Sequence, residues 1–199
     1  MRYSCKICSC TDKLELNYQN PTAEQAFCLE KILICKKCGF GEATPSVPVE
    51  VLESYYKEKY RSKNGASPLN FNYIDTIKPS AYESRFFAQL SGAKLFLKKH
   101  KNINFLDIGA GKGASLSTAE TLLNHPKLHV VEPDKNTRLT YQRHFKELKC
   151  WSSIYDVNSP MDLILCSHVL EHVPGSDVKS FLSQIEKKLS HNGVLILEV

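Results

Sequence analysis

The chain has 199 residues, of which 42% are hydrophobic and 10% aromatic, so it has enough apolar material for one good core and a small accessory module. This composition excludes a disordered protein, and no apolar run approaches the roughly 20 residues of a membrane span. The net charge of +5 is mild and occurs in groups such as Lys98-Lys99-His100-Lys101, at predicted helix ends that are usually solvated. Because no secretory apolar segment follows Met1, we expect a cytoplasmic protein, with neither a membrane nor a nucleic acid as its partner.

Two C-x-x-C pairs near the N-terminus are separated by twenty-six residues. Their members are Cys5, Cys8, Cys35 and Cys38. Two such turns can place four thiolates around one zinc ion, whereas disulfide bonds would face a reducing cytosol. Four ligands leave no position for an activating water, so we expect a structural zinc ion in a zinc-ribbon-like module. Cys10 and Cys28 are alternative ligands, and each is otherwise a simple thiol.

The chain changes character after the cysteine module. Residues 1–45 carry the cysteines and several turn-forming residues, whereas apolar strands alternate with amphipathic helices from residue 71 onward. We therefore expect a zinc-binding module over 1–45, a helical linker over 46–79 and an α/β domain over 80–199. A short, tyrosine-containing helix is predicted within the linker, over residues 49–61.

The α/β domain is predicted to form a doubly wound, mostly parallel sheet. Its first helix begins with the capping sequence Ser80-Ala81-Tyr82-Glu83 and carries apolar residues on one face. Strands are predicted over residues 103–108, 127–132, 150–154, 161–166 and 194–199. Helices are predicted over residues 112–124, after Asp134, and from Val178 until Asn192-Gly193, which is a helix-ending signal.

The fifth predicted strand is a continuous apolar run that reaches Val199. A parallel strand of this kind normally has both faces and a further edge covered. We therefore expect an incomplete sheet, either because a C-terminal part is missing or because a partner or a second copy of the chain covers the exposed edge.

The segment from Phe105 to Gly113 reads as a strand that runs into a glycine-rich turn and then a helix. Closely spaced glycines let the backbone approach a nucleotide-like ligand, and their G-x-G-x-G spacing differs from the G-x-G-x-x-G of dinucleotide folds. S-adenosylmethionine therefore fits better than NAD. Glu132 closes the next apolar run nineteen residues after Gly113 and suits the ribose hydroxyls of such a ligand. The alternative is an ordinary tight turn in another doubly wound domain.

These residues, with Val131-Glu132-Pro133-Asp134 and the stretch 161–174, resemble the class I S-adenosylmethionine-dependent methyltransferases. The resemblance implies that Gly109, Ala110 and Gly111 line the methionine end of the cofactor and that Asp107 organises the turn. Further cofactor-binding candidates are Gly113, Glu132, Asp156 and Ser167. Asp156 would bind the adenine amino group, although it is equally well an ordinary turn aspartate.

Polar residues follow the fourth predicted strand, at the carboxyl edge where doubly wound folds bind ligands. They are Ser167, His168, Glu171 and His172. If a carbon atom is methylated, a base must remove a proton next to a carbonyl, and histidine is suited to this. His172 is the preferred catalytic candidate and His168 the second. The alternative is that these histidines cap the loop or fill the pocket wall.

The order of a four-cysteine module, a tyrosine-containing helix and a methyltransferase domain is similar to the sugar C-methyltransferase family, which acts on nucleotide-linked keto-sugars. The Tyr-x-Glu-His catalytic segment of that family would follow the fifth strand, beyond Val199, so its catalytic residues do not transfer. We expect methyl transfer to a small molecule, with a nucleotide-linked sugar as the finer hypothesis. The alternatives are an RNA-base methyltransferase whose zinc module holds RNA, and a catalytically inactive binding or scaffold protein.

Overall fold

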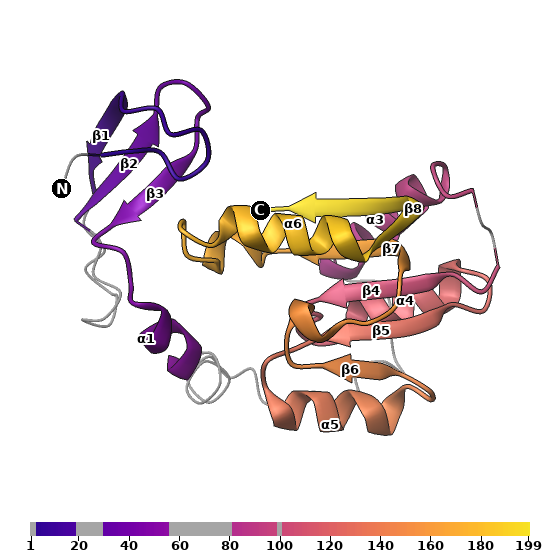
Figure 1. Cartoon of the computed structure of the whole chain (residues 1–199). Helices are drawn as coiled ribbons and strands as arrows, with labels where there is room; N and C mark the ends of the chain where they lie inside the picture. Colours follow the sequence, from indigo (N-terminus) through magenta and orange to yellow (C-terminus); the bar gives the residue numbers. More distant parts are fainter. Residues whose placement is uncertain (1–2, 19–29, 56–80, 99–100) are drawn as a thin grey trace.

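The structure is a computed structural model that describes residues 3–18, 30–55, 81–98 and 101–199 (Figure 1). Within this part of the chain there are two sheets, one of three strands near the N-terminus and one of five strands in the C-terminal half. Three predictions from the sequence lie outside the described residues: the boundary between residues 79 and 80, the capping residue Ser80 and the alternative ligand Cys28.

The N-terminal sheet is antiparallel, with the strand order β1-β2-β3. Its strands are β1 (Lys13–Asn17), β2 (Lys31–Cys35) and β3 (Gly41–Thr44). Pro48 then precedes the short helix α1 (Val49–Ser54), because its fixed φ suits a helix start. The predicted helix over 49–61 is therefore found in its first part, and its remainder falls among residues that the structure does not describe.

The C-terminal sheet has the strand order β6-β5-β4-β7-β8, and every neighbouring pair is parallel. Its strands are β4 (Asn104–Ile108), β5 (Lys127–Val131), β6 (Lys149–Trp151), β7 (Met161–Ser167) and β8 (Leu189–Glu198). The direction of strand addition reverses between β4 and β7, so the carboxyl ends of these two strands border the switch point, where such sheets bind ligands. The predicted doubly wound α/β fold is confirmed.

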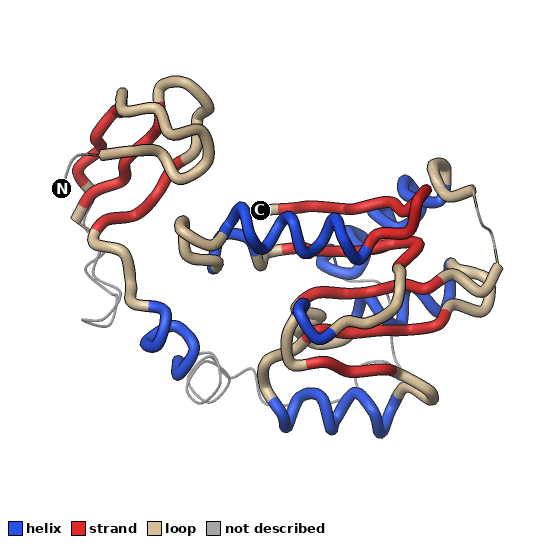
Figure 2. The backbone as a smooth tube through the Cα atoms, in the orientation of Figure 1, coloured by secondary structure: helices blue, strands red, loops and turns tan. Residues whose placement is uncertain are grey.

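Helices cover both faces of this sheet (Figures 1 and 2). They are α3 (Ala81–Lys94), α4 (Ala114–Leu122), α5 (Lys135–His144) and α6 (Val178–Lys188). Leu90 of α3 and Leu116 of α4 pack with Phe105 in one buried cluster, and α6 packs through Ile185 with Leu106 in the other. Successive residues of β4 thus enter opposite cores, which explains why this strand reads as a continuous apolar run. Each such buried side chain stabilises the fold by about 1.5–3 kcal/mol.

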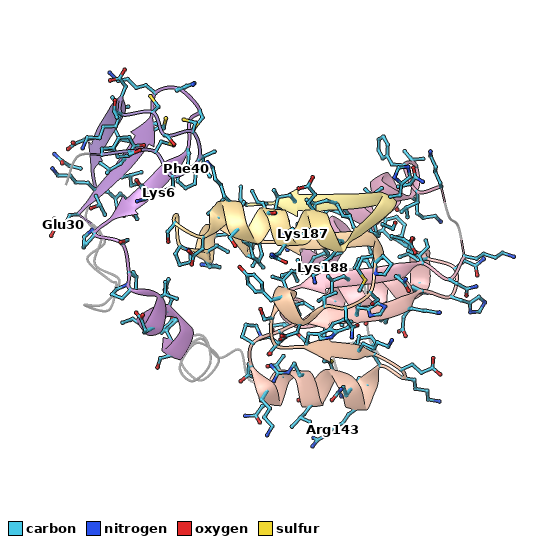
Figure 3. The ribbon with its side chains drawn as sticks, viewed as in Figure 1. Lys6, Glu30, Phe40, Arg143, Lys187 and Lys188 are labelled. Atoms are coloured by element: carbon cyan, nitrogen blue, oxygen red, sulfur yellow. The ribbon has the colours of Figure 1, made fainter. Side chains whose placement is uncertain are left out.

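Two of the helices carry cations on their exposed surface or in their last turn. Figure 3 shows Arg143 on the side of α5 that faces away from the sheet, and Lys187 and Lys188 lie in the last turn of α6. Cations in the last turn complement the helix dipole. None of the described helices is both long and apolar enough to cross a bilayer.

The last strand differs from its prediction. Asn192-Gly193 was expected to end the preceding helix, but α6 ends at Lys188 and β8 already begins at Leu189. Met161 pairs with Leu189 while Leu163 pairs with Val194, so the intervening residues of β8 form a bulge that contains the glycine. A Cβ atom on Gly193 would lie 2.8 Å from the carbonyl oxygen of Met161. The glycine thus permits a close approach between two strands, and the predicted helix end was wrong.

β8 is an edge strand, because β7 is its sole neighbour among the described strands. Leu197 is 42% exposed and Val199 is 71% exposed at its end. Self-association through this edge stays a prediction.

A buried histidine lies in β5. His129 is 3% exposed, and its ring stacks on Trp151 with the ring centroids 5.4 Å apart. Neither ring nitrogen has a hydrogen-bond partner among the described residues. Burial, with smaller contributions from Lys149 and Lys127, lowers the pKa of His129 to about 4. The native state therefore holds this side chain neutral at a pH where the unfolded chain would begin to protonate it.

We predict that His129 makes the fold acid-sensitive. Since the native pKa of His129 lies below its unfolded value, the unfolded chain takes up a proton more readily than the native state. The free energy of unfolding therefore falls as the pH falls from about 6.5 toward 4. In His129→Phe, which keeps the stacking, the free energy of unfolding should fall less between pH 7 and pH 5, by up to about 2 kcal/mol. Urea denaturation at both pH values measures this. The exposed residue His191 offers the control variant His191→Gln, and equal pH dependence in all three proteins would contradict the prediction.

Candidate functional site

The glycine-rich turn between β4 and α4 has a backbone that other residues seldom adopt. Gly109, Gly111 and Gly113 have φ values of 75°, 57° and 78°, all in the left-handed region. At Gly109 there is also no space for a side chain, because a Cβ atom would lie 2.7 Å from Cγ2 of Val169. Gly113 is the N-cap of α4 and offers no side-chain cap, so the first N–H groups of that helix are not capped by it. The sequence motif is thus a sterically required turn.

Asp107 lies just before this turn and is 2% exposed. Its carboxylate accepts a hydrogen bond from the Ser115 hydroxyl in α4. Burial raises the pKa of Asp107 to about 7, the Ser115 hydrogen bond opposes this shift, and the nearby charge of Glu132 adds to it. Near neutral pH the Asp107 carboxyl group is therefore only partly ionised, and a cation bound beside it would favour the ionised form.

Glu132 stands at the end of β5, beside the turn, and is 6% exposed. The parallel register places Ile108 opposite Val131, and the Gly109 N–H donates to the Val131 carbonyl at 2.8 Å. One carboxylate oxygen of Glu132 accepts from the Asp134 backbone N–H at 3.0 Å. Two buried carboxyl groups, those of Glu132 and Asp107, therefore lie at the ends of adjacent strands, as the sequence predicted.

Tyr141 is a further residue of this site. It is fully buried in α5, and its hydroxyl donates to the Gly111 carbonyl oxygen at 2.7 Å. Tyr141 belongs to the helix that the sequence predicts after Asp134, and nothing in the local sequence links it to the glycine turn. The available signal was the tyrosine itself, because a buried hydroxyl group needs a partner.

The segment after β7 borders the same turn, since Val169 lies against Gly109. His168 has a positive φ of 54° and an exposed ring whose Nδ1 is 3.1 Å from Oε1 of Glu171. Its Nε2 is 2.7 Å from Nη1 of Arg85, a residue of α3 that the sequence did not identify. The Ser167 hydroxyl, predicted to face the cofactor, donates to the carboxylate of Glu198.

His172 ends the 3-10 turn η5 (Leu170–His172), and its backbone N–H donates to the Val169 carbonyl at 2.9 Å. Desolvation by surrounding atoms lowers the pKa of His172, Glu171 opposes this and His168 adds to it, although the ring is still solvent-exposed. This histidine is therefore neutral, and able to accept a proton, at neutral pH.

Asp156 lies in the 3-10 turn η4 (Ile154–Asp156), which follows β6. The residue is exposed, and one of its carboxylate oxygens accepts a hydrogen bond from the Ser152 hydroxyl at 3.0 Å. This local contact is also that of an ordinary turn aspartate. Its role toward adenine stays a prediction.

The four cysteines of the N-terminal module lie together, with all four sulfur atoms within 4.8 Å of one another. The Sγ atoms of Cys5 and Cys38, and those of Cys8 and Cys35, are 3.6 Å apart. A disulfide bond would require about 2.05 Å. Four thiolates around one zinc ion, each at about 2.3 Å, would stand about 3.8 Å apart, so the cluster has the dimensions of a tetrahedral metal site.

The backbone around the cluster favours thiolates. Backbone N–H groups, that of Cys38 above all, help to lower the pKa of Cys35 to about 6, whereas burial and neighbouring thiols raise the pKa of Cys8 and of Cys38. Gly39, with a φ of 75°, forms the tight turn after the second pair. Cys10 is outside the cluster, and its sulfur accepts a hydrogen bond from the Asp12 N–H at 3.4 Å. Figure 3 labels Lys6 inside the first C-x-x-C pair and Phe40 after the second.

The solved structures that are similar to this chain include three with TM-scores above 0.5. The cyclopropane synthase MmaA2 from Mycobacterium tuberculosis has a TM-score of 0.52 and 23% identity, covering 65% of this chain and 46% of that chain. The plantazolicin methyltransferase BpumL has a TM-score of 0.52 and 19% identity, covering 75% of this chain and 60% of that chain. The mycolic acid cyclopropane synthase CmaA1 has a TM-score of 0.51 and 18% identity, covering 73% of this chain and 51% of that chain.

These similarities identify the fold, and the chain spans about half the length of MmaA2 and CmaA1. No curated protein sequence matches the chain. Residues 82–199, however, match a family described as a methyltransferase domain. This match covers more than half of the 199 residues, together with the whole glycine turn and both carboxylates. The chain therefore belongs to the methyltransferase domain family.

Proposed function

We propose that the chain binds S-adenosylmethionine beside the turn after β4 and transfers its methyl group to a small molecule. The observation that carries this proposal is the pair of buried carboxyl groups, Asp107 and Glu132, at adjacent strand ends next to a turn that excludes side chains. Two neighbouring buried carboxyl groups are costly to ionise, and a cationic, hydroxyl-bearing ligand would offset this cost. BpumL and CmaA1, which share the fold, were both solved in complex with SAH, the demethylated product of this cofactor.

The cofactor supplies a methyl group that is already activated by its positively charged sulfur. The residues of the chain have to bind it, exclude water and hold the acceptor in line with the carbon–sulfur bond. Asp107 favours a cationic ligand when it is ionised, and Glu132 accepts hydrogen bonds from hydroxyl groups. Tyr141 holds the Gly111 carbonyl and thereby keeps the turn in one conformation.

The acceptor side of the site is the segment after β7. When an acceptor loses a proton as it is methylated, His172 is the preferred base, because its lowered pKa keeps the ring neutral. The ring of His168 already contacts Arg85 and Glu171. We propose a nucleotide-linked keto-sugar as the acceptor, on the basis of the four-cysteine module that precedes the methyltransferase domain.

We further propose that one zinc ion binds Cys5, Cys8, Cys35 and Cys38 and organises residues 1–45, with residues 46–79 as the linker to the methyltransferase domain of residues 80–199. Among the described residues before this linker, the two buried ones are Cys5 and Cys35, so the small sheet has little core of its own. Metal binding would then supply the stability that apolar burial does not.

Calorimetry with S-adenosylhomocysteine tests the central proposal, with Gly109→Ala as the diagnostic variant. The new Cβ would lie 2.7 Å from Val169 on a residue with a φ of 75°. The turn can relieve this strain, about 1–3 kcal/mol, only by leaving the conformation that binds the ligand, so we expect affinity to fall by about five- to 150-fold. Gly92→Ala is the matched control, because a Cβ there has no atom within 4 Å. Absence of heat with folded wild-type protein, or unchanged affinity in Gly109→Ala, would refute the site.

The pKa of Asp107 predicts that S-adenosylmethionine binds more tightly as the pH rises toward 7. Below this value a cationic ligand must displace the proton on the carboxyl group, so affinity should rise by up to about tenfold per pH unit and level off above about pH 7. Calorimetry between pH 5.5 and 7.5 measures this rise. Asp107→Asn should bind weakly with little pH dependence.

Although Asp107→Asn should weaken ligand binding, it should stabilise the ligand-free protein. Burying an ionised Asp107 without a ligand costs free energy as the pH rises from about 4 to about 7. At pH 8, Asp107→Asn should therefore raise the melting temperature of the ligand-free protein, by about 2–4 °C for each 1 kcal/mol gained. A lower melting temperature with retained ligand affinity would show that Asp107 is a structural residue instead.

The cysteine cluster predicts one zinc ion per chain in protein purified without chelator. Cys8→Ser and Cys38→Ser should lose most of this zinc, because each removes one of the four sulfur ligands. Cys10→Ser is the matched control and should keep it, since its sulfur bonds to Asp12 outside the cluster. Elemental analysis measures the metal. Equal zinc content in the Cys8 and Cys10 variants, or none in the wild type, would count against the proposal.

A further inference from the structure

A polar cluster joins three elements beside the acceptor side of the site, and the carboxylate of Glu198, at the end of β8, lies at its centre. The Ser167 hydroxyl donates to Oε2 of Glu198, and the Gln89 side-chain amide donates to the same oxygen at 2.9 Å. Nη1 of Arg85 lies 3.6 Å from this oxygen, and Nε2 of His168 lies 3.8 Å from it. These contacts, and the Ser167 hydrogen bond above all, lower the pKa of Glu198, so the group is ionised at neutral pH.

The hydrogen bonds of His168 determine which of its ring nitrogens carries the proton. A guanidinium group can only donate, so Nη1 of Arg85 at 2.7 Å requires a lone pair on Nε2. The proton of the neutral ring must then be on Nδ1, from which it donates to Oε1 of Glu171 at 3.1 Å. A carboxylate oxygen accepts hydrogen bonds, so Glu171 suits this arrangement. The ring is thus held at both nitrogens by groups of opposite charge.

The backbone of His168 is also held in place. Its N–H donates to the Glu198 carbonyl at 3.0 Å, and its φ of 54° is uncommon for a residue with a side chain. The next residue, Val169, is the one that packs against Gly109 of the cofactor turn. The position of His168 is therefore coupled to the side of the turn at which an acceptor would approach.

We propose that Arg85 and Glu171 are positioning residues that hold His168 as the neutral tautomer protonated on Nδ1, with the lone pair of Nε2 engaged by Arg85, and that Glu198 holds Arg85 in place. His168 then orients the segment after β7, and the acceptor proton goes to His172 and not to His168. The assignment of the acceptor proton to His172, with His168 as an orienting residue, rests on the proposed methyl transfer. The tautomer itself does not, because it follows from the contacts of Arg85 and Glu171 alone.

Nitrogen-15 NMR of the imidazole rings tests the tautomer directly. In wild-type protein, at a pH where the ring is neutral, the His168 signals should show a protonated Nδ1 and an unprotonated Nε2, with His168→Gln used to assign them. Arg85→Gln should shift the ring toward the Nε2-protonated tautomer, which free histidine prefers. Arg85→Lys should retain the wild-type signature in part, since its ammonium group can also donate to Nε2. A wild-type ring protonated on Nε2, or an unchanged ring in Arg85→Gln, would overturn the proposal.

Acylation by diethyl pyrocarbonate, followed by mass spectrometry, gives a second readout. This reagent attacks an unprotonated imidazole nitrogen. Although the His168 side chain is 49% exposed, its Nε2 faces Arg85, so the wild type should react slowly. Arg85→Gln should react at least severalfold faster, whereas the surface variant Glu186→Gln should match the wild type. Equal rates in all three proteins would refute the arrangement.

Calorimetry with S-adenosylhomocysteine separates this proposal from the proposed function. Because Arg85 contacts His168 and Glu198 on the acceptor side of the site, Arg85→Gln should keep cofactor affinity within about threefold of the wild type. Loss of binding in the wild type would refute the cofactor site and leave the tautomer result standing. Loss of binding in Arg85→Gln alone would show that Arg85 belongs to the cofactor site, against its assignment here.

Discussion

Gly109 has no side chain, and this lets Val169 approach so closely that a Cβ atom on the glycine would lie 2.7 Å from it. Through this contact the turn after β4 and the segment after β7 meet at the point where strand addition reverses. The carboxylates beside the turn would bind the cofactor, and the histidines after β7 would face the acceptor. The close approach at Gly109 therefore sets the distance between the two halves of the proposed reaction.

The methyltransferase domain carries polar groups that work against its stability. Asp107 is buried with a raised pKa, and His129 is buried with a lowered pKa. Each costs free energy when it carries a charge, the first as the pH rises and the second as it falls. Apolar cores on both faces of the sheet offset these costs. Asp107 is explained by the proposed cofactor, whereas the ring nitrogens of His129 have no hydrogen-bond partner among the described residues.

The N-terminal module would be stabilised by a bound metal instead of by apolar burial. Leu14 and Leu16 of β1 are 48% and 44% exposed, so its strands bury little apolar surface. Its four sulfur atoms nevertheless lie within 4.8 Å of one another, the arrangement that a bound metal would stabilise. A structural zinc site contributes about 10–16 kcal/mol at neutral pH, far more than three short strands could supply. The module would then depend on its metal and the methyltransferase domain on its cores.

The sequence by itself predicted those features that depend on residues close together in the chain. The glycine turn, the apolar runs of β4, β5 and β7, the carboxylates that end two strands, and the paired cysteines all follow from local spacing, because backbone sterics and ligand geometry act over a few residues. The sequence did not predict the start of β8 at Leu189. Asn192-Gly193 is equally suited to the end of a helix and to a β-bulge, so local preference does not distinguish the two. The Tyr141 bond to Gly111 and the contacts of Arg85 with His168 and Glu198 join residues far apart in the chain. Only the tertiary structure decides such contacts, because they depend on which helices and strands become neighbours when both faces of the sheet are covered.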